Sequence, residues 1–571
     1  MTTFRYETMR GSSPTTSFPV WILLLCLATT VFGVAGHGLW TPDEPRAAEL
    51  VRSMAAPGAS WLYPTLAGKP FVEKPPLFFW GAAVSMKNLG PLIGVEGAIR
   101  AASALSALLT VLVLWGTARC FLGSARGAAA AAALATSALF FQSGHWIVSD
   151  PVLALFVTAA VGLGAAGLER NRAALILAAY ASVGAAFLAK GAVAFALIAP
   201  PAAALFFLYR RRSPGRGWIH PAGAVLAAAV ILAWAVPFKL TGGAEAWKAW
   251  FWDNQVGRFL GRTPELGHLR GPFFYLALLP VVCLPWTPVL LGAIFDRGRR
   301  RETAAPGTPA SRILIVALAW TLGGLLVLSA AGTKRDLYLL PLLPGAAVFV
   351  GAFAFRQPRW AGTSLLVLGW ILVAAMAGAA VVRLEWTGVG MTVGAGFDPV
   401  AAAGALAAAA VLTRSRLGTM PRTAAAAAVF YIVAALVAFP IVDQAKNYKP
   451  GIETVLAELP AADAARVCAW DLDETSRGLL GFYGGVTLYD LHDENPLPDQ
   501  IPALRRALAG EDARFDLMVA MEKREPFPPE GVELDPRRVR AEGRLGLRRR
   551  LLVLDCRPDT GKGPHDERST P

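Results

Sequence analysis

Long apolar runs separated by short polar segments make up the chain from about residue 18 to residue 441. A helix of about 20 apolar residues crosses the hydrocarbon core of a bilayer. The pattern therefore predicts an α-helical polytopic membrane protein with about 13 transmembrane helices. The predicted spans are 18–39, 98–118, 127–148, 151–168, 173–189, 191–209, 220–240, 272–294, 312–331, 336–355, 359–382, 397–413 and 422–441.

A fourteenth run, 77–92, is short and begins after Pro75 and Pro76, so we predict that it lies at the interface instead of crossing. With that choice nearly all the basic loops between spans fall on one side, as the cytoplasmic loops of membrane proteins do. The loops concerned contain Arg119, Arg126, Arg170, Arg172, Arg210, Arg211, Arg212, Arg297, Arg299, Arg300, Arg301, Arg356, Arg359, Arg414 and Arg416.

This topology predicts a cytoplasmic N-terminus (1–17) and a membrane domain (18–441) with periplasmic loops at 40–97 and 241–271. It also predicts a periplasmic C-terminal domain (442–571).

The C-terminal segment is polar enough to form a separate domain. Its apolar pattern predicts short strands at 466–470, 485–491, 515–521 and 549–556, and helices at 450–459 and 498–509. We expect a small α/β domain with a disordered end. Its two cysteines, Cys468 and Cys556, could form a disulfide only in an oxidising compartment.

Composition supports the membrane assignment. Hydrophobic residues make up 55% of the 571 residues and charged residues 16%, against about a quarter in soluble proteins. The net charge of +14 is explained by the basic loops, so membrane lipids are expected partners and nucleic acid is not.

The first periplasmic loop opens with Thr41-Pro42-Asp43-Glu44, which has the form of a capping box with Thr41 as N-cap. Apolar residues follow at helical spacing, so a short amphipathic helix could lie on the membrane surface. The simplest interpretation is a capped interfacial helix. Alternatively, its two carboxylates are catalytic.

Further polar residues fall on the same predicted face. Glu73 and Lys74 stand in the sequence Glu-Lys-Pro-Pro of the first loop. Asp150 precedes a proline at a span boundary, where an N-cap is the common role. Lys190 lies between two spans and could simply extend its ammonium to the interface.

Two more outer segments carry cations beside aromatic residues. The segment 247–271 contains Arg258, His268 and Arg270, which indicate anion binding or, more weakly, a metal. A histidine by itself is more often a hydrogen-bonding residue than a ligand. Basic residues on the outer side are exceptions to the charge rule, and binding a lipid phosphate would explain them. The exceptions at the mouth of the next span are Lys334 and Arg335, with Tyr338.

The order of these motifs resembles that of a known group. The order is DE, EKPP, a second outer Asp, RF…H and K-R-D-x-Y-x-L-P-x-x-P. It is similar to the bacterial ArnT and protein-mannosyltransferase group of polyprenyl-phosphate-dependent glycosyltransferases with the GT-C fold. The motifs extend from about residue 18 to 350.

The resemblance implies roles for these residues. Asp43 would be the catalytic carboxylate, with Asp150 and Glu44 as further catalytic candidates. The donor phosphate would be bound by Lys74, Arg258, Arg270, Lys334, Arg335 and Tyr338. Glu73 and His268 match positions near a divalent metal reported in some relatives, so a metal is a possible cofactor.

The sequence therefore predicts an inverting glycosyltransferase in the bacterial inner membrane. It would move a sugar from a polyprenyl-phosphate donor to lipid A, a protein or an envelope glycan. The alternative is a lipid or solute transporter, which would place ionisable residues near the membrane midplane. Here the charges lie at the outer ends of spans.

Overall fold

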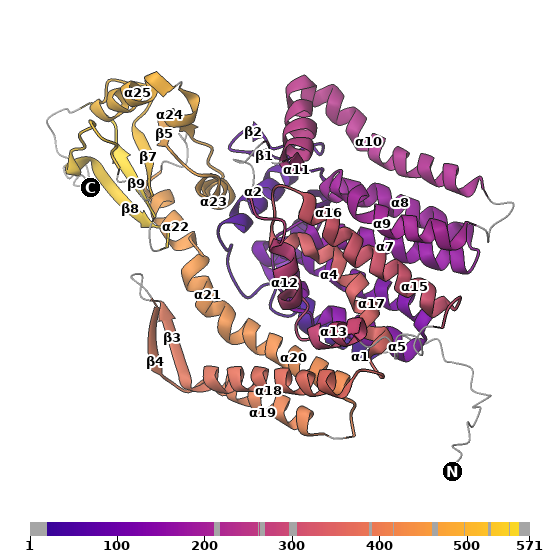
Figure 1. The fold of residues 1–571 in the computed structure, drawn as a ribbon. Helices are drawn as coiled ribbons and strands as arrows, with labels where there is room; N and C mark the ends of the chain where they lie inside the picture. Colours follow the sequence, from indigo (N-terminus) through magenta and orange to yellow (C-terminus); the bar gives the residue numbers. More distant parts are fainter. Residues whose placement is uncertain are drawn as a thin grey trace, which may run out of the picture.

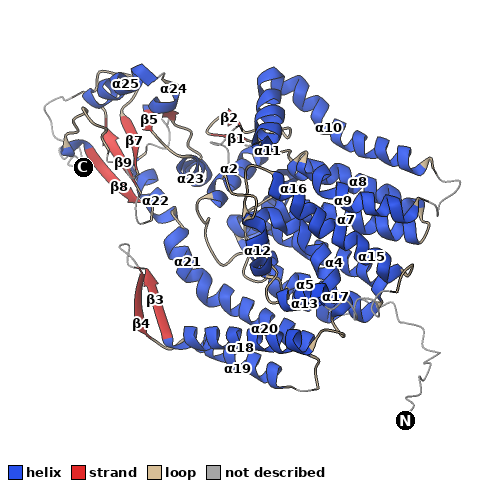
Figure 2. Cartoon of the chain, in the orientation of Figure 1, coloured by secondary structure: helices blue, strands red, loops and turns tan. Residues whose placement is uncertain are grey.

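The computed structural model describes most of the chain. The described residues are 20–210, 217–260, 262, 269–295, 305–386, 391–414, 416–459, 466–495, 497–523, 527–546 and 549–558. The chain forms a large helical domain and a smaller C-terminal domain with a sheet (Figures 1 and 2).

Among these residues, eight helical segments are long and apolar enough to cross a membrane, or ten if two bent pairs each count as one. The eight are α4 (Val95–Leu122), α7 (Asp150–Glu169), α8 (Ala173–Lys190), α10 (Ile219–Lys248) with η2 (Ala249–Gly257), α15 (Pro309–Leu318) with η4 (Ala319–Gly323) and α16 (Gly324–Ala330), η5 (Asp336–Leu342) with α17 (Leu343–Phe353), α18 (Arg359–Val381), and α20 (Thr419–Val433) with η6 (Ala434–Ala438) and α21 (Phe439–Lys446).

The bent pairs are α5 (Ser124–Ala135) with α6 (Ala138–Gly144), at 63°, and α12 (Phe274–Val282) with α13 (Thr287–Phe295), at 115°. Shorter apolar helices are α1 (Val20–Cys26) with η1 (Leu27–Val31), α9 (Val193–Tyr209) and α19 (Pro399–Thr413). Each of the thirteen predicted runs therefore coincides with one long segment, one bent pair or one shorter apolar helix. This confirms the helical membrane fold.

The run at 77–92 forms the separate helix α3 (Leu77–Ile93), directly before α4. Its outer residues Leu92 and Val84 are exposed. It is not among the segments long and apolar enough to cross.

The segment predicted as the loop 241–271 is helical as far as Leu260. Helix α10 breaks at Gly243, whose φ of 74° is readily adopted only by glycine, and continues through η2 into α11 (Arg258–Leu260). Because of this break, the residues after Gly243 turn away from the axis of the span.

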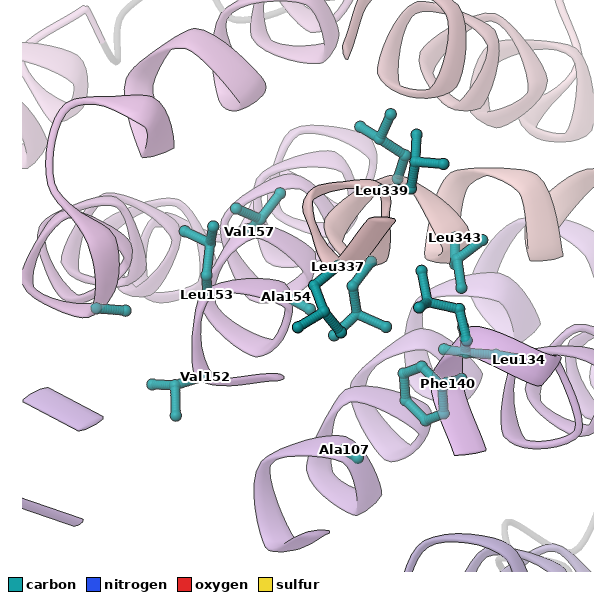
Figure 3. Packing of buried hydrophobic residues seen from close by; sticks show 14 of the residues in the cluster. Ala107, Leu134, Phe140, Val152, Leu153, Ala154, Val157, Leu337, Leu339 and Leu343 are labelled. Atoms are coloured by element: carbon teal, nitrogen blue, oxygen red, sulfur yellow. The ribbon is translucent and has the colours of Figure 1, made fainter. Parts of the chain in front are cut away.

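Small residues allow the central helices to approach closely, as is common in membrane bundles. A Cβ atom on Gly351 of α17 would lie 2.6 Å from the carbonyl oxygen of Arg126 in α5. Figure 3 shows the core of this region, where Leu337 of η5 lies beside Ala154 of α7 and above Phe140 of α6. These side chains are buried.

The C-terminal domain contains one mixed five-stranded sheet of order β6-β5-β7-β9-β8. Its strands are β5 (Val467–Trp470), β6 (Tyr489–Asp490), β7 (Leu517–Glu522), β8 (Val539–Arg544) and β9 (Arg550–Asp555). Its helices are α22 (Lys449–Glu458), α23 (Glu474–Gly484), α24 (Leu491–Glu494) and α25 (Leu497–Ala509), with the 3-10 turn η8 (Pro536–Arg538). Strands β5, β6 and β7 are parallel, and β9 is antiparallel to both its neighbours.

The four predicted strands and two predicted helices of this domain are all present, which confirms its α/β class. The sequence did not indicate β8 or α23. It also did not indicate two small hairpins elsewhere, β1 (Thr65–Leu66) with β2 (Lys69–Pro70) and β3 (Val382–Trp386) with β4 (Met391–Ala395).

Helix α2 (Asp43–Ala55) packs against both α3 and α23 (Figure 1). Its apolar residues Leu50, Val51 and Met54 are buried by protein. The expectation that this apolar face lies on the membrane surface is therefore not met.

The predicted N-cap at Thr41 is wrong, because the N-cap of α2 is Pro42. The backbone N–H of Thr41 donates to the carbonyl of Lys446 at 3.1 Å, which holds Thr41 outside the helix. Glu44 does reach back as in a capping box, accepting the N–H of Trp40 at 2.7 Å.

Candidate functional site

A cavity of about 650 Å³ lies where the start of α7 and the ends of α8 and α16 meet α2 and the loop before α3. Its polar wall contains Asp43, Arg46, Glu73, Lys74, Asp150, Lys190, Asn254, Gln255, Arg335 and Tyr338. Its apolar wall contains side chains of α9, η2, α11 and α16, among them Leu197, Phe251, Phe259 and Leu328. The cavity is thus lined by charged side chains and by a large set of apolar side chains.

Asp43 is the first residue of α2 and is held by cations. Both of its carboxylate oxygens accept hydrogen bonds from the guanidinium of Arg335, one of them at 3.2 Å. The guanidinium of Arg46 lies 3.7 Å away. Burial opposes ionisation of this carboxyl, but Arg335, Arg46 and Lys74 outweigh it and hold its pKa below the usual value.

The segment that carries Arg335 is itself fixed in place. The hydroxyl of Tyr275 donates to the carbonyl of Arg335 at 3.1 Å and accepts the N–H of Arg335 at 3.2 Å. The backbone of Thr333, two residues earlier, forms a β-bridge with Leu269. These backbone contacts at Thr333 and Arg335 fix the position from which the Arg335 side chain reaches Asp43.

The second carboxylate of the cavity, Asp150, is the first residue of α7 and is buried. The ammonium of Lys190, from the end of α8, donates to Asp150 Oδ1 at 2.5 Å. The same ammonium lies 4.2 Å from the ring centre of Tyr338, within cation–π range.

Lys74 also lines the cavity, and its charge interacts with both Asp43 and Asp150. Burial, together with the neighbouring cations Lys190 and Arg46, lowers the pKa of Lys74 to about 8. Binding an anion would stabilise the charged form of a desolvated ammonium more than that of a solvated one. A phosphate placed here would replace the interactions with water that burial removed.

Three predicted residues lie elsewhere. Glu44 is buried outside the cavity, where its carboxylate accepts hydrogen bonds from Arg100 at 2.8 Å and from the N–H of Ile147 at 2.9 Å. Lys334 is buried and donates to the carbonyl of Arg270 at 3.0 Å. Arg270 is exposed, with its guanidinium 5.8 Å from the ring of Phe274. These contacts give Glu44 and Lys334 packing roles.

The structure does not describe the side chain of Arg258, and His268 lies outside the described residues. Within the described part of the chain, no group of three or more His, Cys, Asp or Glu residues is arranged to hold a metal ion. Glu73 lies 4.0 Å from the guanidinium of Arg46. The metal site stays a prediction, and no role below depends on one.

Sequence reasoning missed two cavity cations, Arg46 and Lys190. Arg46 follows Asp43 at a spacing of three, so the two share a helix face, which was a signal available in the sequence. For Lys190, its place between two spans favours a lysine that reaches to the interface. Only the packing of α7 against α8 brings it to Asp150, which is 40 residues away in the chain.

Known proteins resemble the chain in both sequence and structure. Residues 73–238 match the family model described as dolichyl-phosphate-mannose-protein mannosyltransferase. Relatives named undecaprenyl phosphate-alpha-4-amino-4-deoxy-L-arabinose arabinosyl transferase are 32% identical over 351 residues in Sodalis glossinidius and 32% identical over 361 residues in Pseudomonas aeruginosa.

These matches are partial. They cover 58% and 60% of this chain, and 59% and 61% of the two relatives. The chain thus spans about three fifths of the length of the curated relatives it matches.

The structural match is longer. The crystal structure of ArnT from Cupriavidus metallidurans bound to undecaprenyl phosphate has a TM-score of 0.69 and 20% identity, covering 94% of this chain and 97% of that one. Its apo form has a TM-score of 0.65 over the same extent. The chain therefore has the ArnT fold along nearly its whole length, which confirms the fold expected from its motifs.

Proposed function

We propose that the protein is a membrane glycosyltransferase that moves a sugar from a polyprenyl-phosphate donor to an acceptor hydroxyl or amine. The observation that carries this proposal is the composition of the cavity. The carboxylate of Asp43 lines the same cavity as Lys74, Lys190 and Tyr338, and apolar side chains of α9, η2, α11 and α16 line it too. A sugar linked to a lipid phosphate would match this lining, because its phosphate is anionic and its prenyl chain is apolar.

In this proposal the phosphate lies against Lys74 and Tyr338. As the bond between the anomeric carbon and the phosphate oxygen breaks, the electron pair goes to the phosphate and its negative charge grows. Cations near that oxygen bind the transition state better than the ground state, and only such a difference raises the rate. The apolar wall formed by α9, α11 and α16 would receive the first prenyl units.

Asp43 would accept the proton of the acceptor as its oxygen or nitrogen attacks the anomeric carbon from the opposite side. A single displacement of this kind inverts the anomeric centre. The neighbouring Arg335 and Arg46 lower the pKa of Asp43, which keeps it ionised but makes it a weaker base. Its contribution should therefore lie toward the lower end of the usual 10²–10⁴-fold. Asp150, held by Lys190, would position the sugar.

The names of the relatives favour a lipid-phosphate donor. The relatives are named for transfer of aminoarabinose from undecaprenyl phosphate, and the similar crystal structure contains undecaprenyl phosphate. We propose lipid A, a protein or an envelope glycan as the acceptor for this chain.

We also propose that the cavity faces the periplasm of the bacterial inner membrane. It lies at the Asp150 end of α7, while the basic residues Arg170 and Arg172 follow the other end. The charge rule assigns that basic end to the cytoplasm. A reporter active only in the cytoplasm, fused after Arg557, should then be silent, and activity there would reverse this orientation.

The function is tested by supplying the purified full-length protein with a panel of radiolabelled polyprenyl-phosphate sugars and each class of acceptor. Transfer from at least one donor, with inversion at the anomeric carbon, is the expected result. Absence of transfer from every donor, in protein that binds undecaprenyl phosphate, would favour a carrier over an enzyme.

A further inference from the structure

Helix α23 of the C-terminal domain lies directly on α2, the helix that carries Asp43 and Arg46 (Figure 1). Within the described part of the chain, no residue of the C-terminal domain lines the cavity. We propose that α23 positions α2 for the reaction, with Gly478 and Glu474 as positioning residues. The catalytic half of this inference depends on the proposed function.

The helices approach so closely that two glycines of α23 face α2. A Cβ atom on Gly478 would lie 2.9 Å from the carbonyl carbon and oxygen of Pro45 and 3.0 Å from Cα of Arg46. These are backbone atoms, which cannot rotate away. A Cβ on Gly481, one turn further, would lie 2.6 Å from the carboxylate of Glu49. That carboxylate is buried and already bound by Arg52 at 2.6 Å.

Two polar contacts of α23 reach the catalytic end of α2. The hydroxyl of Thr475 donates to the carbonyl of Pro42, the residue before Asp43, at 3.2 Å. The carboxylate of Glu474 accepts from the guanidinium of Arg46 at 2.5 Å. This is much shorter than the distances from Arg46 to Asp43 and Glu73, which are 3.7 and 4.0 Å.

The contact with Glu474 has an electrostatic consequence for Asp43. Without Glu474, Arg46 would be shared only between Asp43 and Glu73, and its charge would move toward Asp43. A second close cation would further weaken Asp43 as a base. We infer that Glu474 therefore holds the guanidinium of Arg46 away from Asp43, so that Arg335 stays the main cation partner of Asp43.

The alternative is that α23 only covers the apolar face of α2 and stabilises the fold. The exposure of Glu474 separates the two explanations. Its side chain is 56% exposed, and exposed ion pairs contribute little to stability. A purely structural role thus predicts that Glu474→Gln has no effect on turnover.

The test compares Gly478→Ala and Glu474→Gln with the control Gly484→Ala. Gly484 lies on the same helix, but a Cβ there would meet the flexible end of Leu456 inside the C-terminal domain, not α2. The measurements are hydrogen exchange of residues 43–55, thermal unfolding, and kcat and donor KM, all on the full-length protein.

In Gly478→Ala we expect faster exchange in α2 and a kcat lower by about 10²-fold, the effect of a 1 Å misplacement. Donor KM should not change, because Lys74 and Tyr338 lie outside α2. Glu474→Gln should lower kcat without lowering the unfolding temperature. Gly484→Ala should match the wild type in exchange and kcat.

Equal exchange in α2 for the Gly478→Ala and Gly484→Ala proteins would overturn the inference, and so would wild-type kcat in Glu474→Gln. A wild-type protein that transfers no sugar would instead contradict the proposed function. The exchange measurement needs no substrate, so these two failures are distinguishable.

Discussion

The ammonium of Lys190 lies 2.5 Å from Oδ1 of Asp150, in a contact where both side chains are at most 13% exposed. The two residues begin and end neighbouring helices, α7 and α8. A buried ion pair of this kind adds little net stability, but removing one partner leaves an uncompensated charge. The pair therefore fixes a carboxylate in the cavity and ties two spans together.

Replacing Lys190 by methionine should destabilise the protein by about 3 kcal/mol, since Asp150 would be left without its cation. The double variant Lys190→Met/Asp150→Asn should recover most of this stability and still be impaired in transfer. Thermal unfolding of the three proteins checks the prediction. A single variant as stable as the double variant would contradict it.

Asp43 and Glu44 are adjacent in the sequence, yet the structure predicts opposite outcomes for them. Glu44 is paired with Arg100, whose side chain is fully buried. Glu44→Gln should therefore destabilise the fold by about 3 kcal/mol or more. The protein that does fold should transfer sugar at nearly the wild-type rate. Normal stability combined with lost transfer would return Glu44 to the catalytic set.

The membrane domain could be predicted from sequence because each span must be apolar over its whole length. Each of the thirteen runs can be recognised without knowing which other helices it packs against. The break at Gly243 and the bend between α12 and α13 could not be predicted, because both depend on packing against other helices. Helix α23 was missed because glycines that serve its contact with α2 interrupt its apolar pattern.

The residues of the cavity could be predicted only in part, because motif order identifies residue types but not the direction of each side chain. Motif order identified Asp43, Lys74, Asp150 and Tyr338, all of which line it. Lys334 illustrates the limit, since it stands beside Arg335 in the sequence but its ammonium is directed to the carbonyl of Arg270. Which of two adjacent cations enters a cavity depends on backbone direction, and a motif does not specify that.

Donor use should fall as the pH rises through the pKa of Lys74, which is about 8 in place of 10.5. Below that pH the ammonium is charged and attracts the phosphate, whereas above it the neutral amine does not. Because kcat/KM reports groups of the free enzyme, its alkaline limb should appear near pH 8. Lys74→Arg should remove this limb, since arginine stays protonated.

A wild-type profile without a limb between pH 7 and the ordinary lysine pKa of 10.5 would contradict this role for Lys74. An unchanged limb in Lys74→Arg would assign the titration to another group. Thermal unfolding of the wild type and of Lys74→Arg at each pH serves as the control. It shows whether a difference in kcat/KM comes from lost stability.

The rate of sugar transfer by purified Asp43→Asn protein tests the account most directly. The substitution keeps the size of the side chain, and the ion pair it removes is partly exposed, so it should destabilise the fold less than breaking the buried pairs of Glu44 or Asp150. Donor binding should remain, because Lys74 and Tyr338 are unchanged. We predict transfer at about 10²-fold below the wild-type rate. Transfer at the wild-type rate would contradict the proposed mechanism itself.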